Sequence, residues 1–244
     1  MRISIMQTND MHGTLDPKRL ELLQTWRAEC DLYFDTGDAI KTGNLGIPVR
    51  TEPVWAMLDA LRCDAGVLGN RETHILTSAF EAKLAGSRHP ILCANLRKRD
   101  GSRPLPTHLI LDCRGVKVGI VGVMVPMVTE RMKTQFASAY LWDPPIETAL
   151  AEAERLGPEV DVLFALTHIG HRQDVALAER GAFDAIFGGH SHTVLMEPQL
   201  VGRTWIAQGG SHNRYAGLYA WDGALKGGLR PIEKADNANR KVNP

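Results

Sequence analysis

Two side chains near the start of the sequence, Asp10 and His12, have types and a spacing suited to binding a metal ion. They follow the apolar segment 2–7, which predicts an extended strand ending in a loop. In an extended segment, residues i and i+2 project to the same side, so this carboxylate and imidazole can converge on one object. An oxygen donor beside a nitrogen donor indicates a metal ion. A capping aspartate and a surface histidine would give the same triplet, so this pattern alone is weak.

Polar side chains of the same kind follow four further predicted strands. The strands 31–35, 65–68, 160–166 and 183–187 lead into Asp38, into Asn70 with Arg71, into His168, and into His190 with His192. In α/β sheets, ligands gather beyond the carboxyl ends of the strands, which is where all of these side chains fall. Packing alone gives no reason to end every strand on a metal donor. The sequence therefore predicts one shared metal site.

The elements that position these residues alternate along the chain. Apolar periodicity predicts helices at 15–29, 53–62, 75–85 and 173–180, and Pro144-Pro145 opens another. Further strands are expected at 90–95, 107–113, 116–124, 203–208 and 215–221, with Arg114-Gly115 as a tight hairpin turn. Alternating strands and helices together with a hairpin indicate an α/β fold with mixed sheets. We expect a single domain over 1–244, with a polar tail at about 234–244.

Composition excludes several classes of protein. The 28 basic and 28 acidic residues balance, which argues against a nucleic-acid partner or a membrane-surface patch. The longest apolar stretch, 116–128, is too short and too interrupted to span a bilayer. The four cysteines form no C-x-x-C pair and indicate reduced core residues. With no secretory pattern at the start, we expect a cytoplasmic protein, or a leader lying outside this sequence.

The ordered motifs D-x-H, G-D, G-N-x-E, a single His and G-H-x-H resemble those of the calcineurin-like metallophosphoesterases. The segments Thr8-Asn9-Asp10-Met11-His12-Gly13 and Gly189-His190-Ser191-His192 are most similar to the 5'-nucleotidase branch. The resemblance covers almost the whole chain, because Gln208-Gly209-Gly210 and Ala216-Gly217-Leu218 stand where that branch has its closing strands. His212, just after this glycine pair, would approach the site from the same side.

The resemblance implies a four-layer αββα sandwich with two mixed β-sheets around two divalent metal ions. One ion would be held by Asp10, His12, Asp38 and His192, and the other by Asp38, Asn70, His168 and His190. Two ions roughly 3.5 to 4 Å apart can clamp a phosphoryl group and activate water, and the resulting hydroxide attacks phosphorus in line. Manganese is the expected metal, and iron, cobalt and zinc are the alternatives. The implied reaction is hydrolysis of phosphoesters or phosphoanhydrides.

The sequence departs from the family where the motif G-N-H-E reads Gly69-Asn70-Arg71-Glu72. Arginine stays protonated near neutral pH and cannot act as a general acid, but its planar fork suits an anionic phosphoryl oxygen. We therefore predict that Arg71 binds phosphate while His74 or His171 moves the proton. Alternatively, Arg71 pairs with Glu72 or another acid, and His74 caps the following helix. A similar G-N-R-D motif occurs in active UDP-diacylglucosamine pyrophosphohydrolases of the same superfamily.

The substrate expected from the resemblance is a small phosphorylated molecule, with nucleotides and nucleotide sugars as candidates. The 5'-nucleotidase branch carries a C-terminal domain that stacks the nucleoside base, and this sequence ends at Pro244 without it. Nucleotide specificity is therefore not carried over. A phosphodiesterase is the nearer rival, and a metal-binding scaffold without activity is the alternative of another class. Because all seven ligand positions are filled, the enzyme is the favoured hypothesis.

Overall fold

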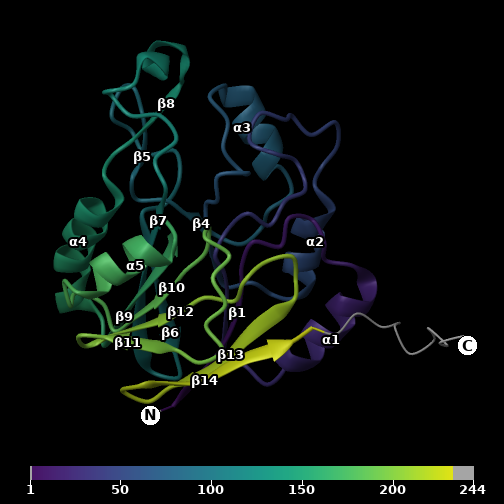
Figure 1. Ribbon diagram of the computed structural model, residues 1–244, viewed down its shortest axis with the longest axis vertical. Coiled ribbons are helices and arrows are strands. Elements are labelled where there is room, and N and C mark those ends of the chain that lie inside the picture. Colours follow the sequence, from purple (N-terminus) through teal and green to yellow (C-terminus); the bar gives the residue numbers. More distant parts are fainter. Residues whose placement is uncertain (1, 233–244) are drawn as a thin grey trace, which may run out of the picture.

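The computed structural model describes residues 2–232, arranged around two six-stranded sheets (Figure 1). The first sheet has the order β14-β13-β1-β2-β3-β4, with bounds Leu225–Pro231, Tyr215–Trp221, Ile3–Thr8, Leu32–Asp35, Ala65–Val67 and Ile91–Leu92. The second has the order β11-β12-β10-β9-β7-β6, with bounds Gln199–Val201, Thr204–Ala207, Ala185–Phe187, Val162–His168, Val116–Met124 and His108–Cys113. A small antiparallel pair joins β5 (Leu96–Lys98) to β8 (Tyr140–Trp142).

Both large sheets are mixed, as predicted. Strands β1 to β4 run parallel in the first sheet, and β13 and β14 add antiparallel strands at its edge. In the second sheet β7, β9, β10 and β12 are parallel, and β6 and β11 pair antiparallel at the two edges. The predicted hairpin joins β6 to β7, and its turn residues Arg114 and Gly115 both have positive φ, as a type I′ turn requires.

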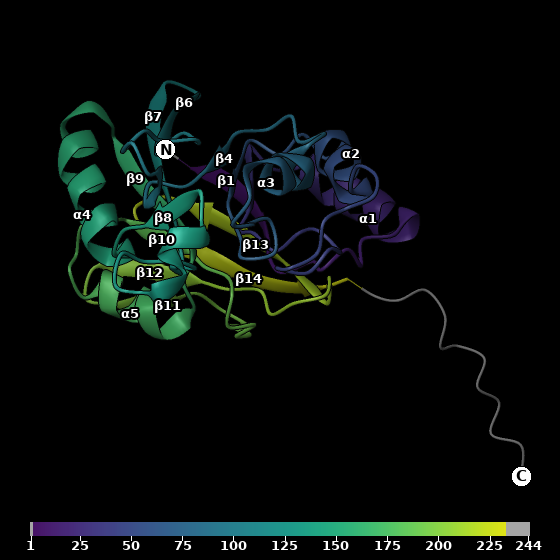
Figure 2. The same cartoon turned by 90° about the horizontal axis from the view of Figure 1, so that it is seen from above.

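Helices cover the outer face of each sheet and complete four layers (Figure 2). The helices α1 (Pro17–Arg27), α2 (Pro53–Ala60) and α3 (Thr77–Leu84) lie on one side, and α4 (Pro145–Leu156) and α5 (His171–Ala178) lie on the other. Short 3-10 helices occur at Lys133–Ala137 and Gly157–Glu159. The two sheets pack face to face through a buried aromatic cluster that includes Phe34, Phe164 and Phe187. The predicted αββα sandwich is confirmed.

Some predicted elements differ in extent. The strand expected at 90–95 pairs only over Ile91–Leu92, because Cys93 and Ala94 turn away and donate to the carbonyls of Pro106 and Gly122. Strand β14 was not predicted, because its two central glycines hide the alternating pattern. In β5, Arg97 donates to the carboxylates of Asp143 and Glu130. The predicted tail at 234–244 lies outside the described residues.

Candidate metal centre

The seven predicted ligands come from the carboxyl ends of five strands in both sheets. Asp10 and His12 follow β1, Asp38 follows β2, Asn70 follows β3, His168 ends β9, and His190 and His192 follow β10. Backbone hydrogen bonds hold the first two loops side by side, because the N–H groups of Asp10 and His12 donate to the carbonyls of Gly37 and Asp38 at 2.9 Å. The two sheets are joined here as well, since His190 N donates to Asp10 Oδ2 at 3.0 Å.

The first group of donors contains Asp10, His12 and His192. The Nε2 atoms of the two histidines lie 3.0 Å apart, and His192 Nε2 lies 3.3 Å from Asp10 Oδ1. His12 Nε2 is 3.9 Å from the same oxygen, and His12 Nδ1 is 4.0 Å from Asp38 Oδ2. Each residue offers one donor atom within 4.8 Å of the others. These side chains can therefore share one ion.

The second group surrounds the amide oxygen of Asn70. This Oδ1 lies 3.1 Å from His168 Nε2 and 2.9 Å from His190 Nδ1. His168 Nε2 is also 3.5 Å from Asp38 Oδ1, and its Nδ1 donates to the Thr36 carbonyl at 2.8 Å. The two oxygens of Asp38 thus face different groups of donors. Asp10, Asp38 and His168 also form a compact triplet, so Asp10 borders both groups.

Several observations show that these side chains fit a divalent ion. Asp10 Oδ1 and His12 Nδ1 are buried and have no hydrogen-bond partner within residues 2–232. Such orphaned atoms are costly unless another group binds them. All donors are oxygen or imidazole nitrogen, a set that suits manganese, iron, cobalt or zinc and resembles an open rather than a closed structural site.

The donor residues occupy an unusual backbone region. Asp10, His12, Asp38, His190 and His192 have φ values of 49°, 51°, 54°, 78° and 55°. The left-handed region costs a non-glycine residue on the order of 1–2 kcal/mol. Such strain persists where surrounding structure over-determines it, and it gathers at functional sites. The strained backbone of these loops is therefore consistent with a role in directing the donor side chains toward one site.

The electrostatics keep several donors deprotonated. Burial, together with the nearby charge of Arg71, lowers the pKa of His12 to about 4. Burial also lowers the pKa of His190, with His168 as the next cause. Burial alone would raise the pKa of Asp10, but the close approach of His192 Nε2 and the charge of His168 outweigh it and leave that pKa lowered. Metal ligands must be deprotonated, so these shifts favour metal binding near neutral pH.

Glu72 of the G-N-x-E motif holds the backbone of the loops that carry Asp38 and Asn70. Its buried carboxylate accepts the N–H groups of Asp38, Ile40 and Gly69 at 3.0, 3.1 and 3.0 Å. Burial raises its pKa to about 7, and the carboxylate of Asp38 is the next cause. Glu72 thus holds the loop after β2 against the turn after β3. It is a support for Asp38 rather than a partner of Arg71.

The structure places the two predicted catalytic residues differently. Arg71 lies at the cluster, because its Nε is 3.9 Å from Asp38 Oδ2 and its Nη1 donates to the Lys41 carbonyl at 2.9 Å. His74 Nδ1 accepts the N–H of Leu76, the N-cap residue of α3, at 3.0 Å. In the structure, His74 therefore contacts the start of the following helix, as the alternative hypothesis of a capping role expects. A catalytic role of His74 stays a prediction.

Two further histidines were considered from the sequence. The His212 ring lies against the His12 ring with centroids 4.6 Å apart, and the backbone N–H of His212 donates to the Asp10 carbonyl at 2.8 Å. The expected approach of His212 to the site is therefore confirmed. His171 begins α5, where its Nε2 lies 2.8 Å from Gln199 Oε1. No contact between His171 and the seven donors is found in the described part of the chain.

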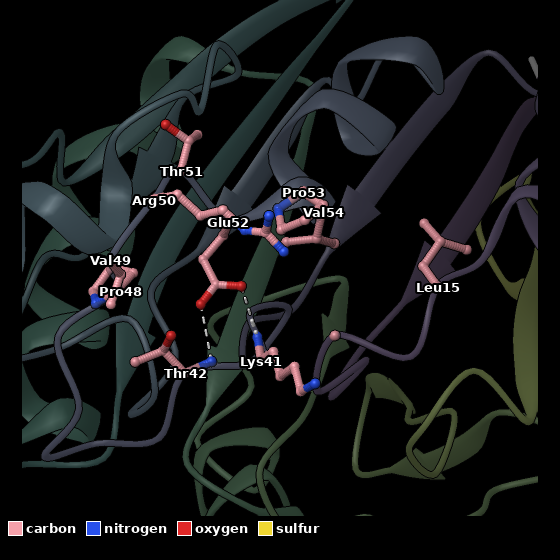
Figure 3. Close-up of a pocket in the computed structure, with 11 residues that line it drawn as sticks. Leu15, Lys41, Thr42, Pro48, Val49, Arg50, Thr51, Glu52, Pro53 and Val54 are labelled. Atoms are coloured by element: carbon pink, nitrogen blue, oxygen red, sulfur yellow. Dashed lines mark hydrogen bonds between the residues drawn. The ribbon is translucent and has the colours of Figure 1, made fainter.

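A pocket of about 630 Å³ lies against the loop between β2 and α2 (Figure 3). Gly13, the residue after His12, and Lys41 line it together with loop residues 48–52. The buried Glu52 carboxylate accepts the backbone N–H groups of Lys41 and Thr42 at 3.2 and 2.9 Å, which fixes one wall of the pocket. The described residues that line this pocket include none of the seven donors, and Gly13 is the one among them that directly follows a donor in the chain.

The fold and the donor set define a class of protein, an α/β sandwich with a site for divalent metal where its two sheets meet. Residues 3–194 match the calcineurin-like phosphoesterase family. Over 241 residues the chain is 28% identical to the 5'-nucleotidase of Vibrio vulnificus (strain CMCP6), covering 82% of this chain and 42% of that protein. Over 234 residues it is 25% identical to the uncharacterized metallophosphoesterase YunD of Bacillus subtilis (strain 168), covering 88% of this chain and 49% of YunD.

Solved structures agree at the level of the fold. The 5'-nucleotidase precursor from Thermus thermophilus matches with a TM-score of 0.77 and 20% identity, covering 95% of this chain and 54% of that one. The chain belongs to the calcineurin-like phosphoesterase family. It spans less than half the length of the Vibrio vulnificus and Bacillus subtilis relatives. None of the helices within residues 2–232 has the length and apolar character needed to cross a membrane.

Proposed function

We propose that this chain hydrolyses small phosphorylated substrates with two divalent metal ions. The observation that carries the proposal is the convergence of seven donors from five strand ends, with the oxygens of Asp38 directed at both groups. One ion would be held by Asp10, His12, Asp38 and His192, and the other by Asp38, Asn70, His168 and His190. Manganese is the proposed metal, with iron, cobalt and zinc as alternatives.

Ions bound at these positions would polarise the phosphoryl oxygens and activate water for attack on phosphorus. The residues of the chain perform the remaining work. Arg71 lies beside Asp38 with a side chain that is 29% exposed, so its guanidinium is available to bind a phosphoryl oxygen. His74 is proposed to move the proton, acting as a donor from its imidazolium form. Burial lowers its pKa, so this form is the minor one near neutral pH.

For the substrate class we propose nucleotides and nucleotide sugars. The support comes from the names of relatives, which include 5'-nucleotidases from Vibrio vulnificus and Thermus thermophilus. A phosphodiesterase remains the second candidate within the same chemistry. We also propose a cytoplasmic location, supported by four cysteines that form no disulfide.

The decisive experiment starts from chelated protein. Mn²⁺, Co²⁺, Zn²⁺ or Fe²⁺ is added back, and turnover is compared on a phosphomonoester, a phosphodiester, a nucleoside diphosphate and a nucleotide sugar. We expect metal-dependent turnover with two ions bound per chain, and an Asp38→Asn variant serves as the inactive control. Two bound ions without turnover on any substrate would favour a metal-binding scaffold instead.

A further inference from the structure

The loop between β2 and α2 is fixed by charged side chains rather than by its own backbone. Within residues 41–50 a single backbone pair is formed, from Gly46 N to the Gly43 carbonyl at 3.0 Å. Glu52 accepts two N–H groups of this loop, and Arg71 donates to the Lys41 carbonyl. The far side of the loop is held by a third charged residue, which carries this inference.

That residue is Lys83 of α3, whose side chain is fully buried. Its Nζ lies 2.9, 3.0, 2.7 and 2.8 Å from the carbonyl oxygens of Gly43, Asn44, Arg71 and Thr73. Four carbonyls around one ammonium form a cage that compensates a buried positive charge. Two of these carbonyls belong to the loop, and the other two belong to the turn that begins at Asn70.

The loop held by Lys83 in turn contacts a proposed metal ligand. Asn70 Nδ2 donates to Asn44 Oδ1 at 3.0 Å, while Asn70 Oδ1 faces His168 and His190. A side-chain amide has an oxygen end that binds metal and a nitrogen end that does not. The bond from Nδ2 to Asn44 therefore selects the orientation in which Oδ1 points into the donor cluster.

We propose that Lys83 is a positioning residue for the metal centre, which fixes Asn44 so that Asn44 holds the Asn70 amide with its oxygen toward the metal. The inference rests on the proposed function, because it takes Asn70 as a ligand of one ion. Groups that orient a metal ligand typically contribute about 10- to 100-fold to metal affinity. The ion held by Asn70 should therefore depend on Lys83 and Asn44, whereas the ion held by Asp10, His12 and His192 should not.

The test measures the two Mn²⁺ dissociation constants of chelated protein by titration, with electron paramagnetic resonance to separate single ions from coupled pairs. We expect Lys83→Met and Asn44→Ala to weaken one ion by about 10- to 100-fold and leave the other within about threefold. Asn44→Asp keeps the acceptor for Asn70 Nδ2, so it should restore the ratio of the two constants. Its added charge acts on both ions, which is why the ratio is compared.

Arg27→Met is the matched control. Arg27 is also a largely buried cation, and it donates to the carbonyls of Cys30, Leu61 and Arg62, which precede strands and lie away from the seven donors. The inference would be overturned if the ratio of the two dissociation constants in Lys83→Met and Asn44→Ala stayed at the parent value. It would also be overturned if Arg27→Met changed that ratio by the same factor. If Lys83→Met does not fold, Asn44→Ala decides alone. Parent protein that binds fewer than two ions would contradict the proposed function itself.

Discussion

At the scale of single residues, Arg71 sets this site apart from the family motif. It replaces the histidine expected between Asn70 and Glu72, and its guanidinium lies beside Asp38. We predict that Arg71→Ala lowers kcat/KM by about 100- to 1000-fold, the range found when one donor to a charged transition state is removed. Because arginine cannot protonate a leaving group, the parent should also favour phosphoanhydrides and activated esters over alkyl phosphates.

Rates on esters of graded leaving-group pKa measure this preference. Arg71→His should flatten the dependence by supplying an acid, and Arg71→Lys should keep the charge but lose the fork. Equal kcat/KM in the parent, Arg71→Ala and Arg71→His would show that Arg71 does not act in the transition state.

A second prediction concerns Asp174, a buried acid in α5. Its Oδ1 accepts the Thr167 hydroxyl at 2.6 Å, its Oδ2 has no partner within residues 2–232, and burial raises its pKa to about 8. The folded protein therefore keeps a proton that the unfolded chain loses near pH 4. Its contribution to stability is full below that pH and is lost as pH rises to about 8.

Asp174→Asn removes this titration while preserving the shape of the side chain. The free energy of unfolding of the metal-free parent should fall with pH between 5 and 8 by roughly 1 kcal/mol per unit more than that of the variant. Urea unfolding at several pH values measures the difference. Parallel pH profiles for the two proteins would show that Asp174 is ionised in the folded state.

At the scale of elements, the loop between β2 and α2 depends on Glu52. Its carboxylate is the acceptor for the N–H groups of Lys41 and Thr42. Glu52→Ala should lower the free energy of unfolding by about 1–3 kcal/mol, because two partly buried donors lose their acceptor. Hydrogen exchange at residues 41 and 42 should accelerate, and exposed Glu29→Ala is the control. Unchanged exchange at both amides would mean that the loop is held without Glu52.

Elements also show where sequence patterns fail. The long strands β1, β7 and β9 and all five α-helices could be predicted, because their apolar periodicity is uninterrupted. The short strands β5, β8 and β11 have three residues each. Their pairing depends on segments far away in the chain, as when Leu96 pairs with Trp142.

At the scale of the molecule, the donor cluster joins two sheets that otherwise meet only through apolar packing and a few polar contacts. Metal binding should therefore stabilise the whole sandwich. Mn²⁺ at 100 times its dissociation constant should add about 2.7 kcal/mol, which for a chain of this size raises Tm by about 5–10 °C. Asp38→Asn should lose most of this shift, and exposed Asp112→Asn should keep it. If the Tm did not change although metal binding had been verified, metal binding would not stabilise the contact between the two sheets.

The candidate site was only partly predictable, for a physical reason. The seven donors follow strands directly, so local sequence indicates them, and His212 follows a glycine pair in the same way. Lys83 and Asn44 carry no such signal, because a lysine on a helix and an asparagine in a polar loop ordinarily face solvent. Their role emerges only when folding brings residues 43–44 and 71–73 to one ammonium.

The left-handed backbone of Asp10, His12, Asp38, His190 and His192 has a consequence for the amount of protein in a cell. Without metal, only the surrounding structure offsets this conformational energy, so we expect the empty form to unfold more often and to be degraded faster. Metal supply would then control abundance as well as activity. We expect a shorter half-life in metal-depleted cells after synthesis is blocked, followed by immunoblot. An equal half-life with and without metal would show that metal supply does not control the abundance of the protein.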